Sequence, residues 1–239
     1  FVLRIGLLNY LLKDLPTPKN LTLNDNYNVS TQIFDRNGIL LYEIYADENR
    51  TPISISDLPD YVSQASIAIE DRRFYSHFGF DVIGISRAAL ANIQGGRISE
   101  GGSTITQQLV KNALLTKEKT FKRKIKEAIL AVMTELLYSK EEIMEMYLNY
   151  ISYGGTAVGI ESAANHYFDK HAKDLTLAEA SLLAGLPQAP SRYSPFASDG
   201  TQSKERQKEV LNRMVEDGYI SELEAADAAS QHLEFALST

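Results

Sequence analysis

The 239-residue sequence contains no cysteine, so disulfide bonds, thiol nucleophiles and thiolate metal sites are all excluded. Its four histidines do not cluster at metal-ligand spacings, which argues against a histidine-based zinc site. Basic residues are outnumbered by acidic ones, 24 to 31, and the formal charge of −7 does not indicate a general nucleic-acid binder. No run of 18 apolar residues occurs, so the sequence predicts no complete membrane-spanning helix.

What is present is enough for a folded core, because 44% of the residues are hydrophobic and 23% are charged. The first residues, 1–12, are apolar but short, and they indicate either the end of a membrane segment or a plain amphipathic helix. Residues 13–30 are polar with two prolines and are typical of a linker. We therefore expect residues 1–30 to form a juxtamembrane segment and linker.

Two β-type runs flank Asn37-Gly38, which is a strong hairpin signal, and residues 31–50 are therefore predicted to form a β-hairpin element. From Pro59 onward the pattern is mostly helical, with capping-box spacings that begin at Thr104, Ser139 and Thr176. A last pair of amphipathic helices is expected over 201–237. The predicted fold is mainly α, with a domain over 51–239.

An unusual carboxylate pair, Glu70-Asp71, follows the apolar run Ile67–Ile69 and precedes two arginines. One interpretation is an ordinary helix end, with both carboxylates solvated and paired to the arginines. However, a helix C-terminus and apolar neighbours both disfavour a charged carboxylate. A carboxylate in such a setting suits a general acid or base.

A second cluster follows the glycine pair at 101–102. Thr104, Gln108 and Lys111 are spaced to share one helix face, which carries a hydroxyl, an amide and an ammonium group. This face is either solvated or a seat for an anion at a helix N-terminus. The glycines do not form a P-loop, because no Lys-Ser/Thr pair follows at the required spacing.

A third cluster, residues 116–127, holds six basic residues against two acidic ones. This contrast with the acidic chain indicates an anionic partner, either a phosphate group or anionic lipid headgroups. Arg123 and Glu127 are one helical turn apart and could also form an ordinary surface ion pair. Taken together, two glutamates in separate helices and a cationic anion seat suit displacement at a sugar carbon with a phosphate leaving group.

These blocks closely resemble the peptidoglycan glycosyltransferase domain, glycosyltransferase family 51, of bacterial class A penicillin-binding proteins. The resemblance covers about 60–200, in the family's order, and we take this range as the motif core. It implies a mainly α, lysozyme-like fold with two lobes around a cleft. The matching blocks are 70–81, 101–112, 123–131 and 140–155, with weaker matches at 159–168 and 177–195.

The resemblance implies polymerisation of lipid II into glycan strands, with Glu70 as the general base for the acceptor 4-hydroxyl. Glu127 matches the second essential glutamate, which supports the leaving diphosphate directly or through a divalent cation, Mg²⁺ or Mn²⁺. His77 is equally compatible with a buried structural histidine. The substrate-binding residues implied by the resemblance are Asp71, Phe74 and His77 near the acceptor and Thr104, Gln108, Lys111, Arg123 and Lys124 near the donor sugar or diphosphate.

The resemblance also implies a location and partners. These are the outer face of the cytoplasmic membrane, an N-terminal membrane anchor that precedes this sequence, and a C-terminal transpeptidase domain in the full-length parent. The glycine-rich loop 95–102 is expected to order on substrate binding. Residues 80–93 either dip into the bilayer beside the lipid tail or form a core helix.

Two other functions compete with this interpretation. A lytic transglycosylase or muramidase on a related fold would need a general-acid glutamate in a drier pocket. Such an enzyme has no use for a cationic diphosphate seat at Lys111 and Arg123. A non-catalytic, membrane-proximal scaffold is the second alternative, and the retention of both glutamates and the cations argues against it.

Overall fold

The computed structural model describes most of the chain and separates it into two compact units. Unit 1 comprises Phe1–Asp25 and Arg73–Tyr147, and unit 2 comprises Asn26–Arg72 and Leu148–Thr239. The residues described are 15–21, 31–34, 36, 40–44, 51–84, 86, 102–115, 120–197 and 200–236.

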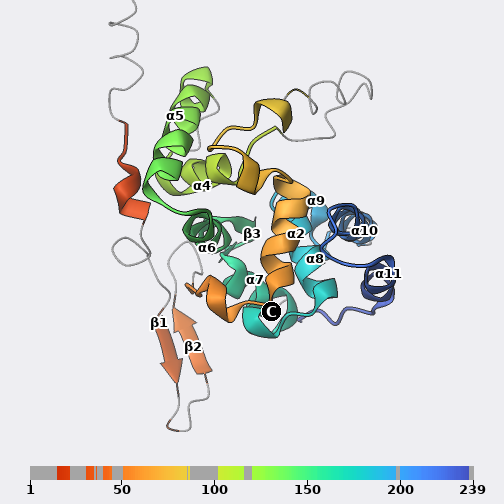
Figure 1. The fold of residues 1–239 in the computed structure, drawn as a ribbon. Coiled ribbons are helices and arrows are strands. Elements are labelled where there is room, and N and C mark those ends of the chain that lie inside the picture. The colour runs from red at the N-terminus through yellow and green to blue at the C-terminus, as the bar shows by residue number, and fades with distance from the viewer. Residues whose placement is uncertain are drawn as a thin grey trace, which may run out of the picture. The chain divides into compact units, whose positions relative to one another are not determined.

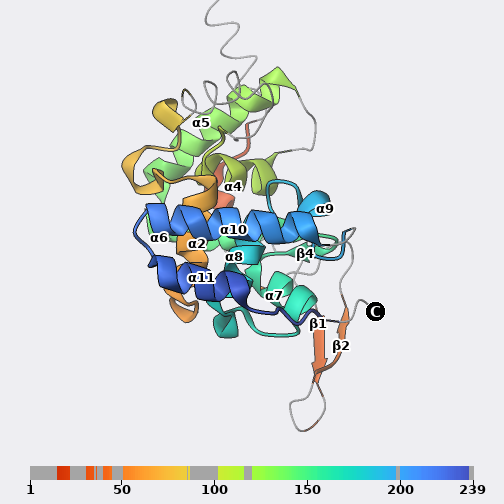
Figure 2. The ribbon, with the colours of Figure 1, turned by 90° about the vertical axis from the view of Figure 1, so that its right-hand side faces the viewer.

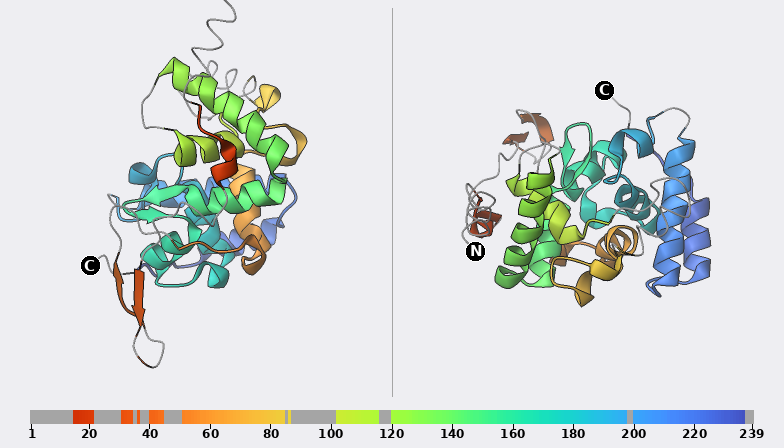
Figure 3. Two further views of the ribbon diagram at one scale, coloured as in Figure 1. Left: turned by 90° about the vertical axis from the view of Figure 1, so that its left-hand side faces the viewer. Right: turned by 90° about the horizontal axis from the view of Figure 1, so that it is seen from above.

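Unit 1 is helical in the part that the structure describes (Figure 1). Its main helices, α4 and α5, pack against each other, and the short helix η1 lies against α5 (Figure 3). The elements are η1 (Pro18–Leu21), η3 (Phe74–Ser76), α4 (Ile105–Leu114), α5 (Phe121–Leu137) and α6 (Lys140–Tyr150), the last of which continues into unit 2.

Local sequence signals explain where these helices begin. Thr104 and Gln107 form the predicted capping box of α4, with each side chain bonded to the other residue's backbone N–H. The Thr120 hydroxyl accepts a hydrogen bond from the backbone N–H of Arg123 and caps α5. At α6, Ser139 and Glu142 bond reciprocally to each other's backbone N–H groups.

Unit 2 contains two small antiparallel sheets and a set of packed helices. In the first sheet, β1 pairs with β2 from Thr31 opposite Ile44 to Phe34 opposite Leu40, with an irregularity after Ile33. The elements are β1 (Thr31–Phe34), β2 (Leu40–Ile44), η2 (Ile55–Asp57), α2 (Asp60–Glu70), β3 (Ser152–Gly154), β4 (Ala157–Val158), α7 (Ile160–Phe168), η4 (Ala172–Asp174), α8 (Leu177–Gly185), α9 (Pro190–Tyr193), α10 (Thr201–Glu216) and α11 (Glu222–Ser230).

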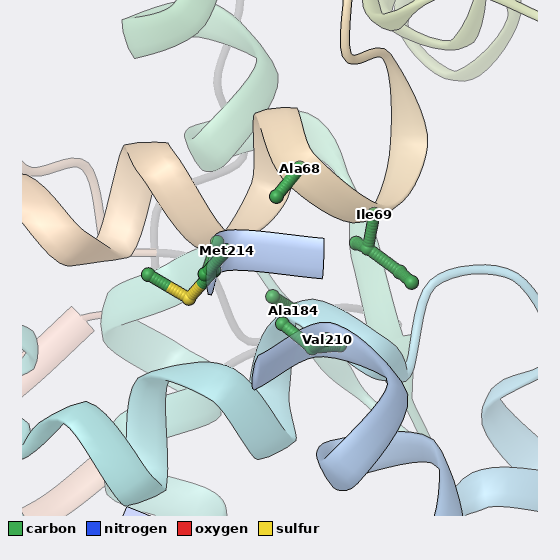
Figure 4. Packing of buried hydrophobic residues seen from close by; sticks show 6 residues of the cluster. Ala68, Ile69, Ala184, Val210 and Met214 are labelled. Atoms are coloured by element: carbon green, nitrogen blue, oxygen red, sulfur yellow. The ribbon is translucent and has the colours of Figure 1, made fainter. Parts of the chain in front are cut away.

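The core of unit 2 is built where α2, α8 and α10 meet. Alanines at 65, 68 and 184 allow the helix backbones to approach closely, and larger side chains fill the remaining space (Figure 4). Helix α8 is buried on nearly every side, which fits its central place between the other two helices. Helix α11 packs beside α10 (Figure 2).

A second tertiary contact fixes the segment that leads into α2. The Asn149 side chain accepts a hydrogen bond from the Ile53 backbone N–H at 2.9 Å and donates one to the Ile53 carbonyl at 2.8 Å. This pair of bonds mimics a strand ladder and holds the approach to α2 in place.

The predicted mainly helical fold with a small N-terminal β-hairpin is confirmed. The predicted final helix pair is present, but α11 ends at Ser230 rather than near 237, because the backbone becomes extended at Gln231. The domain boundaries at residues 30 and 50 stay predictions. Residues 1–14, 87–101 and 116–119, which include most of the 95–102 loop, lie outside the described residues.

Candidate active site

Glu70 is the last residue of α2, and its side chain is only 10% exposed. The three residues immediately before it, Ile67, Ala68 and Ile69, are buried, and they hold this end of α2 against the core. Asp71 caps the helix through its backbone N–H, which donates to the Ile67 carbonyl at 2.9 Å, and is itself 7% exposed. The interpretation of Glu70 and Asp71 as a solvated pair is therefore wrong.

The two arginines that follow have carboxylate partners elsewhere. In unit 2, Arg72 Nε donates to Asp217 Oδ1 at 2.7 Å, and its Nη1 lies 3.0 Å from Glu216 Oε2. In unit 1, Arg73 Nη1 lies 3.3 Å from Asp81 Oδ1. Sequence proximity to the carboxylate pair therefore did not identify these ion pairs.

Glu70 instead faces a cation that sequence reasoning missed. Arg206 Nη2, from α10, lies 3.9 Å from Glu70 Oε1, and the Arg206 side chain is 6% exposed. Tyr153 of β3 is also nearby, since burial raises the pKa of its phenol and the negative charge of Glu70 raises it further.

A signal for Arg206 was present in the sequence. The buried positions of α10 follow helical spacing, from Ser203 through Arg206 and Val210 to Met214. An arginine on such an apolar stripe requires a buried partner. The sequence does not say which carboxylate that partner is.

Phe74 and His77 lie in unit 1, on and just after η3. Phe74 is fully buried, and Lys140 Nζ lies 4.4 Å from its ring centroid. His77 is partly buried and meets the Phe74 ring edge-on at a centroid distance of 6.5 Å. Phe74 is therefore a core residue of unit 1.

The polar face predicted for α4 is not solvated at its first two members. Thr104 is 2% exposed and Gln108 is 8% exposed, while Lys111 is partly buried. The Thr104 hydroxyl caps α4 and also donates to the Gly79 carbonyl at 2.9 Å. The Thr104 hydroxyl therefore both accepts and donates a hydrogen bond within unit 1, and Thr104 is a positioning residue for the start of α4.

Glu127 lies on α5 and is 1% exposed, so the ordinary surface-pair interpretation is wrong for it. Its Oε1 accepts a hydrogen bond from Lys124 Nζ, and its Oε2 lies 3.6 Å from Arg123 Nη1. Lys124 Nζ also donates to Ser103 Oγ at 2.9 Å, immediately before α4. One carboxylate between two cations gives this cluster an excess of positive charge, which favours an anionic ligand.

A divalent cation finds no ready-made protein site here. Among the residues that the structure describes, no group of three or more His, Asp or Glu side chains is placed to hold a metal ion. Glu127 is surrounded by Lys124 and Arg123, whose charges oppose a second cation. These residues do not fit a protein-held Mg²⁺ or Mn²⁺.

The expected site residues thus form two groups, one in each unit. Glu70, predicted to be the base for the acceptor, and its neighbour Asp71 belong to unit 2, and the remaining members belong to unit 1. The unit 1 members are Phe74, His77, Thr104, Gln108, Lys111, Arg123, Lys124 and Glu127.

Comparison with known proteins places the chain in a family. The model of the family described as Transglycosylase matches residues 37–215. Penicillin-binding protein 1A of Aquifex aeolicus is 45% identical over 232 residues, which cover 96% of this chain and 32% of that protein. Penicillin-binding protein 1F of Bacillus subtilis is 46% identical over 206 residues, which cover 86% of this chain and 29% of that protein.

A solved structure supports the fold. The 2.6 Å crystal structure of penicillin-binding protein 1A from Haemophilus influenzae matches with a TM-score of 0.51 and 24% identity, over 89% of this chain and 22% of that one. The chain spans about a third of the length of the curated relatives described above. By the family match and these relatives, the chain belongs to the transglycosylase family, glycosyltransferase family 51.

Proposed function

We propose that this chain is a peptidoglycan glycosyltransferase that polymerises lipid II into β-1,4-linked glycan strands. The observation that carries the proposal is the buried Glu127 carboxylate held between Arg123 and Lys124. A cationic cluster of this kind serves a departing diphosphate. It has no role in cutting a finished glycan, where the leaving group is a sugar hydroxyl.

Glu70 is the proposed general base. Its carboxylate takes the proton from the acceptor's 4-hydroxyl as that oxygen forms a bond to the donor's anomeric carbon. The bond from that carbon to the diphosphate breaks on the opposite face, so an α-linked donor gives a β-linked product. The near-burial of Glu70 supports this role, because a base works best where water does not compete for the proton.

The unit 1 cations are proposed to stabilise the leaving group. Negative charge on the diphosphate grows as its bond to the sugar breaks, and fixed cations stabilise that charge most strongly when little water is present. Arg123 has a side chain that is 20% exposed, and Lys124 one that is 45% exposed, so a ligand can reach both. Gln108 and Lys111 of α4 are proposed as further binding groups for the donor sugar or diphosphate.

A lipid substrate also requires contact with the bilayer, and unit 1 exposes apolar side chains suited to it. Five residues between 75 and 83 are 42% to 62% exposed. This segment packs at Gly79 against the backbone of Ala131 in α5, beside the exposed side chain of Val132. The five residues are Tyr75, Phe78, Phe80, Val82 and Ile83.

We further propose that the protein acts at the outer face of the cytoplasmic membrane and that its parent carries a C-terminal transpeptidase domain. The support is the name penicillin-binding protein borne by the relatives and the fact that this chain spans only part of their length. Among the described residues, no helix is long and apolar enough to cross a bilayer.

The test is lipid II polymerisation in detergent by the 239-residue chain, compared with its Glu70→Gln variant and with products resolved by gel. We expect wild-type strands and a loss of about 10²- to 10⁴-fold in the variant, the usual contribution of a general base. Circular dichroism checks that the variant folds. Full activity of the variant contradicts the base assignment, and cleavage of finished glycan by the wild type favours the lytic alternative.

A further inference from the structure

Arg206 is a buried cation that the proposed mechanism does not yet use. Its guanidinium makes several contacts within unit 2 in addition to the 3.9 Å approach to Glu70. Nη1 donates to Glu209 Oε2 at 2.7 Å, and Nε lies 3.4 Å from the Gly185 carbonyl. The guanidinium carbon lies 5.3 Å from the ring centroid of Tyr193. These contacts fix the position of its charge.

The fold makes room for this side chain at Gly185, the last residue of α8. A Cβ atom at that position would lie 2.8 Å from Arg206 Cγ, closer than real side chains approach. Burying a guanidinium costs free energy unless partners compensate for lost water. A merely space-filling residue here would not require a charge, so the charge itself calls for an explanation.

We infer that Arg206 is the positioning residue for Glu70: it favours the ionised carboxylate and holds it at the end of α2. This inference rests on the proposed function. At 3.9 Å the contact exceeds hydrogen-bond length, so the attraction is electrostatic. Such a contact stabilises the ionised base without the close bidentate geometry that would oppose its protonation during the reaction.

Glu209 sets how strongly Glu70 experiences this charge. It lies one turn further along α10, bonds to Arg206, and also accepts a hydrogen bond from Arg213 at 3.1 Å. Its side chain is 43% exposed, whereas that of Arg206 is 6% exposed. Glu209 therefore competes with Glu70 for the same guanidinium.

Within the part of unit 2 that the structure describes, the following charged and titratable groups act on Glu70 or lie beside it. Arg206 of α10 lies 3.9 Å from it and also pairs with Glu209, while the phenol of Tyr153 in β3 is within reach of its charge. On its own chain segment, Asp71 follows it, and Arg72 pairs with Asp217. Among these groups, neutralising Arg206 removes positive charge near Glu70, whereas neutralising Glu209 removes the negative charge that competes for Arg206.

The experiment is the pH dependence of kcat/KM for lipid II polymerisation by the 239-residue chain and three variants. In Arg206→Met we expect the acid limb to move up by about one pH unit or more, because Glu70 then protonates at higher pH. Arg206→Lys, which keeps a charge, should restore part of the shift. Glu209→Gln removes the competitor, so its acid limb should move to lower pH.

The opposite shifts distinguish this role from a structural one. A variant that simply loosened unit 2 would lose activity at every pH without moving the limb. If Arg206→Met does not fold, Glu209→Gln still decides, because its altered group is partly exposed. An unmoved acid limb in folded Arg206→Met, or in Glu209→Gln, overturns the inference.

The outcome also separates this inference from the proposed function. A wild-type chain that makes no glycan from lipid II contradicts the proposed function itself. A wild-type chain that polymerises, with inactive Glu70→Gln but unshifted Arg206 and Glu209 variants, overturns only the positioning role. Circular dichroism and thermal unfolding of every variant accompany the kinetics.

Discussion

The two proposed site glutamates have side chains that are only 1% (Glu127) and 10% (Glu70) exposed, yet they obtain their positive partners in different ways. Glu127 in unit 1 is paired with Arg123 and Lys124, which lie within one turn of the same helix. Glu70 in unit 2 faces Arg206, which lies 136 residues away in the sequence and on a different helix. One environment is local in the chain, and the other depends entirely on tertiary packing.

This difference matches the two tasks that we propose. A leaving diphosphate needs positive charge, and neighbours on one helix supply it wherever that helix goes. A general base needs partial desolvation and a finely placed cation, which requires helices α2, α8 and α10 to pack in one arrangement. We therefore expect Glu70 to be the more sensitive of the two to changes in the core.

The largest effect among the following predictions is expected for Glu127→Gln. This change removes the negative charge that orients Lys124 and Arg123, and we expect kcat to fall by about 10²- to 10³-fold, as for other preorganised electrostatic groups. Lipid II polymerisation measures the loss.

The same helix provides a matched control in Glu135. It is also buried and pairs with Lys140 at 2.7 Å, while accepting a hydrogen bond from the Thr106 hydroxyl at 2.6 Å. Glu135→Gln should lower the free energy of unfolding by ~3 kcal/mol, as when a buried pair is broken. Its kcat should stay near that of the wild type. Equal losses of kcat in the two variants would remove the distinction between a site carboxylate and a structural one.

An intermediate effect is expected for Gly185→Ala, which changes the surroundings of Arg206 in unit 2. The added Cβ meets Arg206 Cγ at 2.8 Å, so the flexible arginine must shift away from its present place. We expect kcat/KM to fall about tenfold and the acid limb of its pH profile to rise by about one unit. The pH–rate profile checks both.

Gly218→Ala is the control for a glycine replacement in the same unit. Gly218 has a φ of +75°, and among the described residues other than its chain neighbours no atom would lie within 4 Å of a Cβ there. Alanine at a positive φ should lower the free energy of unfolding by about 1–2 kcal/mol. The acid limb should stay in place, and a shift equal to that of Gly185→Ala would point to a general loosening of unit 2.

The smallest effect concerns Tyr153, beside Glu70. Burial and the charge of Glu70 raise the pKa of this phenol. Above pH 10, Tyr153 therefore stays neutral in the folded protein, whereas it ionises in the unfolded chain. The unfolding free energy should therefore fall above pH 10, by up to about 1.4 kcal/mol per pH unit from this group. Tyr153→Phe should reduce the slope, as measured by urea unfolding at pH 9 to 11. An unchanged slope would show that Tyr153 does not contribute.

Much of the local structure could be predicted from the sequence. The capping boxes at Thr104 and Thr176, the start of α2 after Pro59 and the strands around Asn37-Gly38 follow from short-range signals. The pairing of Arg123 with Glu127 was equally visible as helical spacing. These features depend on residues within a few positions of one another, so the chain specifies them locally.

Burial and long-range partners were decided only by the tertiary structure. Helical spacing did not predict that Glu127 would be buried, and tertiary packing of α5 leaves it only 1% exposed. The sequence also suggested Arg72 and Arg73 as partners of Glu70 and Asp71, whereas folding directs these arginines to Asp217 and Asp81. Arg206 reaches Glu70 because α2, α8 and α10 share one core. The spacing of residues in the sequence does not predict which helices will pack together.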